Sequence, residues 1–184
     1  ASLLVSPTQA ELLPPPPTLT GTLAVLYHIS LAMATQTNSI PVILNKKRTF
    51  IIKEKISKKE LVSKLVNAIC DDLPEADREY MLAAVLKREQ GISTTLDTGL
   101  SIPHARMEDL RAFEAAVAVM PQGISDEYGL QIKVMFLFLS PAGQTYFSQH
   151  LKLLASLAEK FKASFLTELS SCQNEEEVLN KISF

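Results

Sequence analysis

The chain has 184 residues, with 18 Lys and Arg residues against 20 Asp and Glu residues and a formal net charge of −2. This length holds one sizeable domain and a short appendage, and this charge excludes a protein that depends on a basic surface to bind nucleic acid. The only cysteines, Cys70 and Cys172, are far apart and lack metal-ligand spacing, so we expect reduced thiols and no metal site. No phosphate-binding or dinucleotide-binding glycine pattern is present, so we expect no cofactor and a chemistry that rests on side chains.

The first part of the chain differs in composition from the rest. Residues 1–45 contain one formal charge, Glu11, and six of the ten prolines, four of them consecutive at 14–17. Residues 19–34 are apolar but fall short of the ~20 residues that a membrane span needs, and no basic segment precedes them as in a secretory signal. We therefore expect an apolar, proline-rich extension over residues 1–38, a domain over residues 39–184 and a cytoplasmic protein.

Two short strands and two helices are expected next. Residues 40–44 and 49–53 are rich in β-branched and aromatic side chains, which favours strands. Ser57 and Glu60 have the spacing of a capping box, and apolar residues recur at helical spacing to about residue 70. A second helix is predicted from about 77 to 90, with Arg88 in its last turn, where an arginine also complements the helix dipole.

Residues 93–106 are interpreted as a polar loop centred on His104. Pro103 restricts the backbone before this histidine and Gly99 permits a turn or a close approach. A histidine in such a loop can act as a nucleophile or general base, because much of it is neutral at pH 7; an ordinary surface histidine is the alternative. Side chains or backbone amides that could face a bound anion come from Ser93, Thr94, Thr95 and Gly99.

The remaining pattern predicts two strands followed by three helices. Residues 115–120 form an apolar run that Pro121 to Gly123 should end, and 132–139 are almost continuously apolar, as in a central strand buried on both faces. Helices are expected from His150, over 165–169 and over about 175–182. Strands between helical blocks indicate an α/β fold of the α+β type, a three-layer α-β-α domain with a central mixed β-sheet.

His150 is predicted to lie in the first turn of its helix, on the inward face in phase with Leu154, Leu157 and Phe161. The unpaired backbone N–H groups of a first turn favour anions. A second histidine at such a helix end is a candidate partner for His104 at an anion site. The alternative is a buried histidine with purely structural hydrogen bonds.

Two motifs then point to a family. The sequences Arg88-Glu89-Gln90, Ser93-Thr94 and Gly99-Leu100-Ser101-Ile102-Pro103-His104 resemble the phosphorylation-site signature of type-2 enzyme IIA domains, the fructose/mannitol and nitrogen-regulatory branch of the bacterial sugar phosphotransferase system. The run from Val134 to Pro141, followed by His150-Leu151-Lys152-Leu153-Leu154, resembles the same family's second signature. The resemblance covers about residues 40–184.

The resemblance implies a phosphotransferase component that works through a phosphohistidine. His104 would accept the phosphoryl group, His150 would be its active-site partner and Arg88 would be a positive group near the phosphate. The donor would be the histidine phosphocarrier protein. The acceptor would be an enzyme IIB, or phosphorylation would act as a regulatory switch, which the lack of any segment similar to IIB or membrane IIC domains favours.

Two rival functions remain, and two residues depart from the family pattern. A non-catalytic IIA-like regulatory domain would bind partners without transferring phosphate, and a two-histidine metal or hydrolytic site would need a third ligand or a nucleophile. Thr95 and Asp97 stand where the family often has glycine. A carboxylate at 97 would repel a phosphoryl group if it faced the site.

Overall fold

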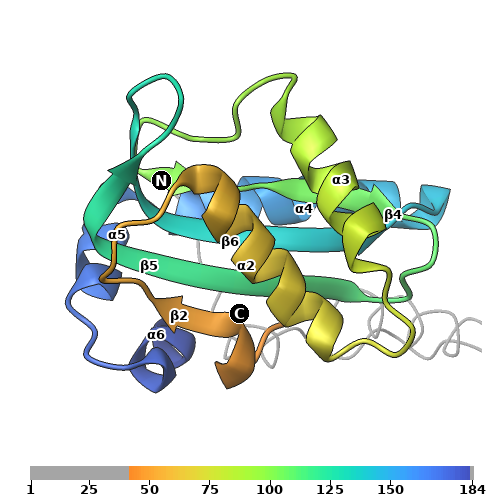
Figure 1. Ribbon diagram of the computed structural model, residues 1–184, viewed down its shortest axis with the longest axis horizontal. Coiled ribbons are helices and arrows are strands. Elements are labelled where there is room, and N and C mark those ends of the chain that lie inside the picture. Colours follow the sequence, from red (N-terminus) through yellow and green to blue (C-terminus); the bar gives the residue numbers. More distant parts are fainter. Residues whose placement is uncertain (1–41, 183–184) are drawn as a thin grey trace, which may run out of the picture. The chain divides into compact units, whose positions relative to one another are not determined.

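The computed structural model describes residues 42–182, so the extension predicted over residues 1–38 lies outside the described residues and stays a prediction. The described elements form a mixed sheet with helices on both faces (Figure 1). In chain order they are β1 (Val42–Ile43), the 3-10 helix η2 (Lys46–Arg48), β2 (Thr49–Ile51), α2 (Lys58–Asp71), α3 (Arg78–Glu89), β3 (Leu100–Ser101), β4 (His104–Met107), β5 (Phe113–Ser125), β6 (Gln131–Pro141), α4 (Gln144–Lys160), α5 (Ala163–Ser170) and α6 (Glu175–Ile182).

The sheet is built around the antiparallel pair β5 and β6, in which Ala116 lies opposite Leu137. The short strands β1 and β2 pair with β5 in parallel, and β3 and β4 pair with β6 in parallel. Because β5 and β6 lie inside the sheet and are covered on both faces, their sequences are almost continuously apolar. The expected central mixed sheet is confirmed.

Two hydrophobic cores lie on opposite faces of this sheet. Helices α2 and α3 pack on one face, where buried residues such as Leu65 and Val85 join Leu137. Helices α4, α5 and α6 supply the other core, where Leu157 and Leu169 join Phe136 and other side chains of the opposite face. Figure 1 shows α2 and α3 in front of the sheet and α4 behind it, which confirms the three-layer α-β-α arrangement.

The predicted start of α2 is confirmed in detail. The Ser57 hydroxyl accepts a hydrogen bond from the Glu60 N–H, and the Glu60 carboxylate accepts one from the Ser57 N–H at 2.9 Å. These two bonds satisfy backbone donors that a helix start leaves unpaired. Helix α3 begins after Asp77, which accepts from the Tyr80 N–H, and ends at Glu89, so Arg88 lies in its last turn as predicted.

Three predicted boundaries were wrong. Strand β5 does not end at residues 121–123 but runs to Ser125, because an irregular register between Val119 and Ile124 absorbs the extra residues. The segment 93–106 is not all loop, because β3 and β4 extend the sheet beside β6. Helix α4 begins at Gln144, six residues earlier than predicted, so His150 lies in its second turn and away from the unpaired N–H groups of the first.

One buried cation on the α2 side of the sheet was not anticipated. Arg48, at the end of η2, is almost fully buried and forms ion pairs with Glu114 of β5 and with Asp72 after α2. Its guanidinium also donates to the Ile69 carbonyl at 3.3 Å. A charge this deep requires such partners, so one cation ties η2, α2 and β5 together.

Within residues 42–182, no helix is both long enough and apolar enough to cross a membrane.

Candidate phosphohistidine site

His104 is the first residue of β4, and its backbone lies beside Phe138 of the parallel neighbour β6. The Phe138 N–H donates to the Pro103 carbonyl at 3.1 Å, and the Ile102 N–H donates to the Thr94 carbonyl at 3.0 Å. The imidazole stacks on the Phe138 ring with 5.4 Å between ring centroids and 12° between planes. The sheet therefore holds the His104 ring in one orientation, and only 7% of the residue is exposed.

One hydrogen bond decides which ring nitrogen of His104 carries the proton. Nδ1 lies 2.8 Å from the Ile102 carbonyl oxygen, which can only accept, so Nδ1 is protonated in the neutral ring. Within the described part of the chain, no hydrogen bond engages Nε2. The lone pair on Nε2 is therefore available to a reaction partner, which is the requirement for a histidine nucleophile.

The pKa of His104 lies below the usual value for histidine, with burial as the main cause. The hydrogen bond to Ile102 and the Glu89 carboxylate raise the pKa, while the positive charge of Arg88 lowers it. Since the net shift is downward from about 6.5, the ring is neutral at pH 7.

His150 of α4 lies directly beside His104, with ring centroids 5.2 Å apart and an angle of 63° between planes. Its ring also packs against the Phe138 ring, with 5.2 Å between the ring centroids, so the same phenylalanine supports both histidines. His150 is 5% exposed, and its Nδ1 lies 2.7 Å from the Ser140 hydroxyl oxygen. The structure thus brings together the two histidines that the sequence singled out.

The pKa of His150 is lowered to about 4. Burial is the largest cause, followed by the positive charges of His104 when protonated, Arg106 and Arg88. Both rings are therefore neutral at pH 7, and the positive charge at the site comes from arginines.

Arg88 lies in the last turn of α3, and its Nη1 donates to the Ile92 carbonyl at 3.1 Å. Its charge lowers the pKa of both histidines, as expected of a cation at the rim of their site. Arg88 is exposed to solvent, and its guanidinium forms no ion pair within residues 42–182. It thus retains donors for an anion.

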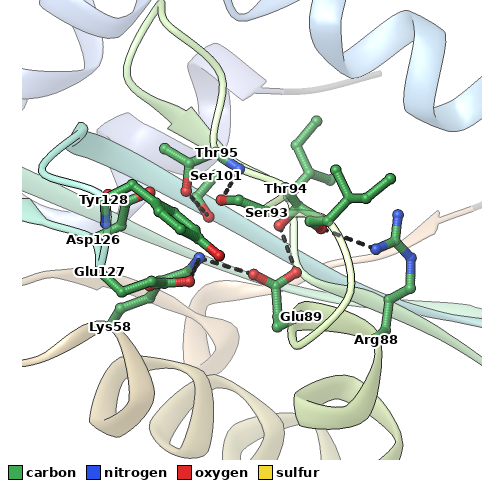
Figure 2. A network of polar contacts seen from close by, with 12 residues as sticks. Lys58, Arg88, Glu89, Ser93, Thr94, Thr95, Ser101, Asp126, Glu127 and Tyr128 are labelled. Carbon is green, nitrogen blue, oxygen red and sulfur yellow. Dashed lines mark hydrogen bonds and ion pairs between the residues drawn. The ribbon is translucent and has the colours of Figure 1, made fainter.

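The hydroxyls predicted to face an anion are largely engaged with protein groups (Figure 2). The Thr94 hydroxyl donates to the Glu89 carboxylate at 2.6 Å, and the Thr95 hydroxyl bonds to the Ser101 hydroxyl at 3.4 Å. The Ser93 hydroxyl accepts from the Thr95 N–H at 3.2 Å and keeps its proton free to donate. Of these three hydroxyls, that of Ser93 is the one that remains suited to an anion.

Gly99 and Asp97 lie at the other end of this segment. The turn from Leu96 to Leu100 closes through hydrogen bonds at its base, and Gly99 has a φ of +97°, which favours glycine. Leu100 pairs with β6 four positions before His104 does, a separation of about 13 Å at the usual strand rise of ~3.3 Å per residue. The structure therefore brings neither Gly99 nor Asp97 next to the histidine pair.

In residues 42–182, no group of three or more His, Cys, Asp and Glu residues is placed to hold a metal ion. Cys70 and Cys172 are both buried free thiols.

Comparison with known proteins decides the family. Residues 42–184 match the family described as the phosphoenolpyruvate-dependent sugar phosphotransferase system, EIIA 2. The chain belongs to this family. The type-2 EIIA match covers the whole described fold, so the resemblance found in the two motifs is confirmed.

Individual relatives of this EIIA domain agree with the family. A nitrogen regulatory protein of Pseudomonas aeruginosa is 28% identical over 104 residues, which cover 55% of this chain and 66% of the relative. The crystal structure of the nitrogen regulatory protein IIA-Ntr from Neisseria meningitidis superposes with a TM-score of 0.65 at 22% identity, covering 77% of this chain and 96% of that one. The crystal structure of IIA mannitol from Escherichia coli gives 0.62 at 17%, covering 77% and 99%. These two structures show the shared fold.

Arg106 of this EIIA domain lies close enough to the histidine pair for its charge to lower the pKa of His150, and sequence reasoning did not single it out. It follows His104 by two positions on β4, so both side chains leave the same face of the strand. Its Nη2 donates to the carbonyls of Ala142 at 2.5 Å and Gly143 at 3.2 Å, and its guanidinium lies 5.0 Å from the centre of the Phe147 ring. The spacing would have revealed Arg106 if the segment had been interpreted as a strand.

A buried ion pair supports the loop that precedes His104 (Figure 2). Lys58, at the start of α2, lies 2.9 Å from the Glu89 carboxylate, and these side chains are only 10% and 9% exposed. Glu127 approaches the same ammonium group at 3.5 Å. Glu89 therefore joins the start of α2 to the end of α3 and, through Thr94, to the loop.

Glu89→Gln should lower the free energy of unfolding by about 3 kcal/mol, because it leaves a buried lysine with only the weaker Glu127 contact. Lys58→Met/Glu89→Gln should recover most of this loss, since no buried charge then lacks a partner. Urea unfolding of the wild type, both single variants and the double variant measures the coupling. Purely additive losses would show that Lys58 and Glu89 do not stabilise each other.

The low pKa of His150 predicts a pH dependence of stability. Between the unfolded pKa of about 6.5 and the folded value of about 4, the unfolded state binds more protons, so stability falls as the pH is lowered through this range. His150→Gln cannot take up that proton. We expect the loss in urea stability from pH 7 to pH 5 to be smaller in this variant than in the wild type. Equal losses would contradict a neutral, buried His150.

Proposed function

We propose that this EIIA domain is a phosphoryl carrier in which Nε2 of His104 accepts and releases the phosphoryl group. The observation that carries the proposal is the Ile102 hydrogen bond at Nδ1, which leaves the Nε2 lone pair available in a neutral ring. The donor is the phosphohistidine of a histidine phosphocarrier protein. The Nε2–P bond forms as the N–P bond of the donor breaks, and the donor imidazole keeps that electron pair.

The surroundings of His104 suit this transfer. Phosphoryl transfer depends on in-line positioning and on stabilising charge that spreads over the phosphoryl oxygens. Phe138 and the β4–β6 pairing fix the His104 ring, while His150, Arg88 and Arg106 surround it with donors and positive charge. These groups stand in place before the reaction, which is the arrangement that lowers a barrier most.

The partner is proposed to be a protein that docks around the histidine pair. Large apolar side chains are exposed close to the site: Ile92 follows α3, and Phe147 and Leu151 flank His150 on α4. Exposed apolar groups beside a reactive residue favour a protein partner over a free small molecule. The Escherichia coli complex of enzyme IIA and phosphorylated enzyme IIB for mannitol has the same fold, with a TM-score of 0.62 at 16% identity and covering 77% of this chain and 97% of that one, and supports an enzyme IIB as acceptor.

Within this proposal we place the protein in the nitrogen-regulatory branch, acting in the cytoplasm. The support is that the Pseudomonas aeruginosa and Neisseria meningitidis relatives are both named as nitrogen regulatory proteins. In this branch phosphorylation of His104 switches binding to target proteins rather than feeding transport.

Incubation with phosphoenolpyruvate, enzyme I and the phosphocarrier protein tests the proposal. We expect intact mass to rise by one phosphoryl group, in an acid-labile and base-stable bond, and His104→Ala to take up none. His28→Ala, which removes the third histidine of the chain, is the matched control and should be labelled normally. A wild type that takes up no label would favour a non-catalytic IIA-like regulatory domain, and labelled His104→Ala would overturn the residue assignment.

His150→Gln distinguishes a transfer partner from a structural core histidine. The amide keeps a donor and much of the volume but loses the ring, so transfer should slow by roughly 10²–10³, the scale of losing one donor at a developing anion. Unfolding free energy at pH 7 should fall by only about 1–3 kcal/mol, because the buried Ser140 hydroxyl loses its partner at Nδ1 while α4 keeps Leu153 and Leu157 in the core. A loss of stability with normal transfer per folded molecule would remove His150 from the site. Rapid-quench transfer rates and urea unfolding provide both numbers.

A further inference from the structure

A single hydroxyl interrupts the apolar face of β6 beneath the site. Phe136, Phe138 and Ser140 alternate onto the face that α4 covers, and Ser140 is completely buried there. Its Oγ lies 2.7 Å from Nδ1 of His150, and within residues 42–182 this is its one side-chain hydrogen bond. A buried hydroxyl on an otherwise apolar face needs a hydrogen-bond partner. The partner here is His150, one of the two histidines of the site.

The direction of this hydrogen bond follows from what each group can satisfy. If His150 donated from Nδ1, the buried Ser140 hydroxyl would only accept, and its own proton would have no acceptor, which is costly. If Ser140 donates to Nδ1, the hydroxyl is satisfied. Since His150 is neutral at pH 7, its single proton then lies on Nε2.

We propose that Ser140 is a positioning residue that holds His150 as a neutral ring with its proton on Nε2, ready to donate to the phosphoryl group. This inference rests on the proposed phosphoryl transfer. His104 and His150 then carry opposite tautomers: His104 offers a lone pair at Nε2, and His150 offers an N–H at Nε2. With the rings 5.2 Å apart, one nitrogen forms the bond to phosphorus while the other donates to a phosphoryl oxygen.

A neutral donor suits a carrier that must release what it binds. Arg88, Arg106 and His104 are the charged or titratable groups whose fields reach His150, and all three oppose its protonation. A donor without net charge stabilises the transfer without adding a third cation that would hold the phosphoryl group after transfer. Only interactions that strengthen in the transition state speed the reaction.

The decisive measurement uses the unphosphorylated, ¹⁵N-labelled full chain at pH 7. Long-range ¹H–¹⁵N correlation distinguishes protonated from unprotonated ring nitrogens. We expect His104 to show its proton on Nδ1 and His150 to show it on Nε2, with the Nδ1 signal of His150 displaced as in an acceptor of a hydrogen bond. A proton on Nδ1 of His150, or a doubly protonated ring, would overturn the proposal without any variant.

Ser140→Thr and Ser140→Val form a matched pair of nearly equal size that differ in the hydroxyl. We expect the Thr protein to keep the wild-type His150 signals and transfer rate. The Val protein should lose the hydrogen-bonded Nδ1 signal and transfer roughly 10-fold more slowly, which is the scale of one ordinary hydrogen bond and a smaller effect than losing the ring itself. Urea unfolding separates this from a folding defect. Equal rates and equal His150 signals in the two variants would overturn the proposal.

Two results on the wild type separate the role of Ser140 from the carrier function. A wild type that is phosphorylated on His104 but carries the His150 proton on Nδ1 overturns the role of Ser140 and leaves the carrier function standing. A wild type with the expected tautomers that takes up no phosphoryl group overturns the carrier function, and with it any role of Ser140 in transfer.

Discussion

The register between β4 and β6 places His104 beside Phe138 and Arg106 beside Ser140. A shift of one residue would turn the His104 side chain to the opposite face of the sheet, toward α2 and α3 and away from His150. The register is held because β6 is buried on both faces and because the Phe138 N–H bonds to the carbonyl of Pro103, just before the histidine. The whole candidate site therefore depends on how a four-residue strand is paired.

The electrostatics of the site follow from burial. Both imidazoles lie within the protein and are neutral at pH 7, whereas the permanent charges, Arg88 and Arg106, are exposed at its edge. In the proposed carrier, this division would leave a nucleophile with a free lone pair and still provide positive charge for an arriving phosphoryl group. Glu89 acts in the opposite sense on His104, and its pairing with buried Lys58 limits how much negative charge it presents.

Much of the fold could be predicted from the sequence because local and tertiary signals agreed. The capping box at Ser57 and the apolar spacing defined α2, and the uninterrupted apolar run defined β6. The strand at His104 was missed because Pro103 and Gly99 look like loop residues when the neighbouring strand is not known. The start of α4 was missed because Gln144 to Gln149 are mostly polar with no apolar periodicity, so His150 was placed at a helix end it does not occupy.

Some residues of the candidate site could be predicted from the sequence and others could not. The histidine pair was recognisable from its motifs, but the partners of Ser140 and Thr94 depend on contacts between separate segments that no spacing reveals.

The central claim is that phosphorus bonds to Nε2 of His104. Nuclear magnetic resonance of the ¹⁵N-labelled phosphorylated protein tests this claim most directly. The account predicts ³¹P–¹⁵N coupling to Nε2 of His104 with its proton retained on Nδ1. Coupling to Nδ1 of His104 or to either nitrogen of His150 would contradict it.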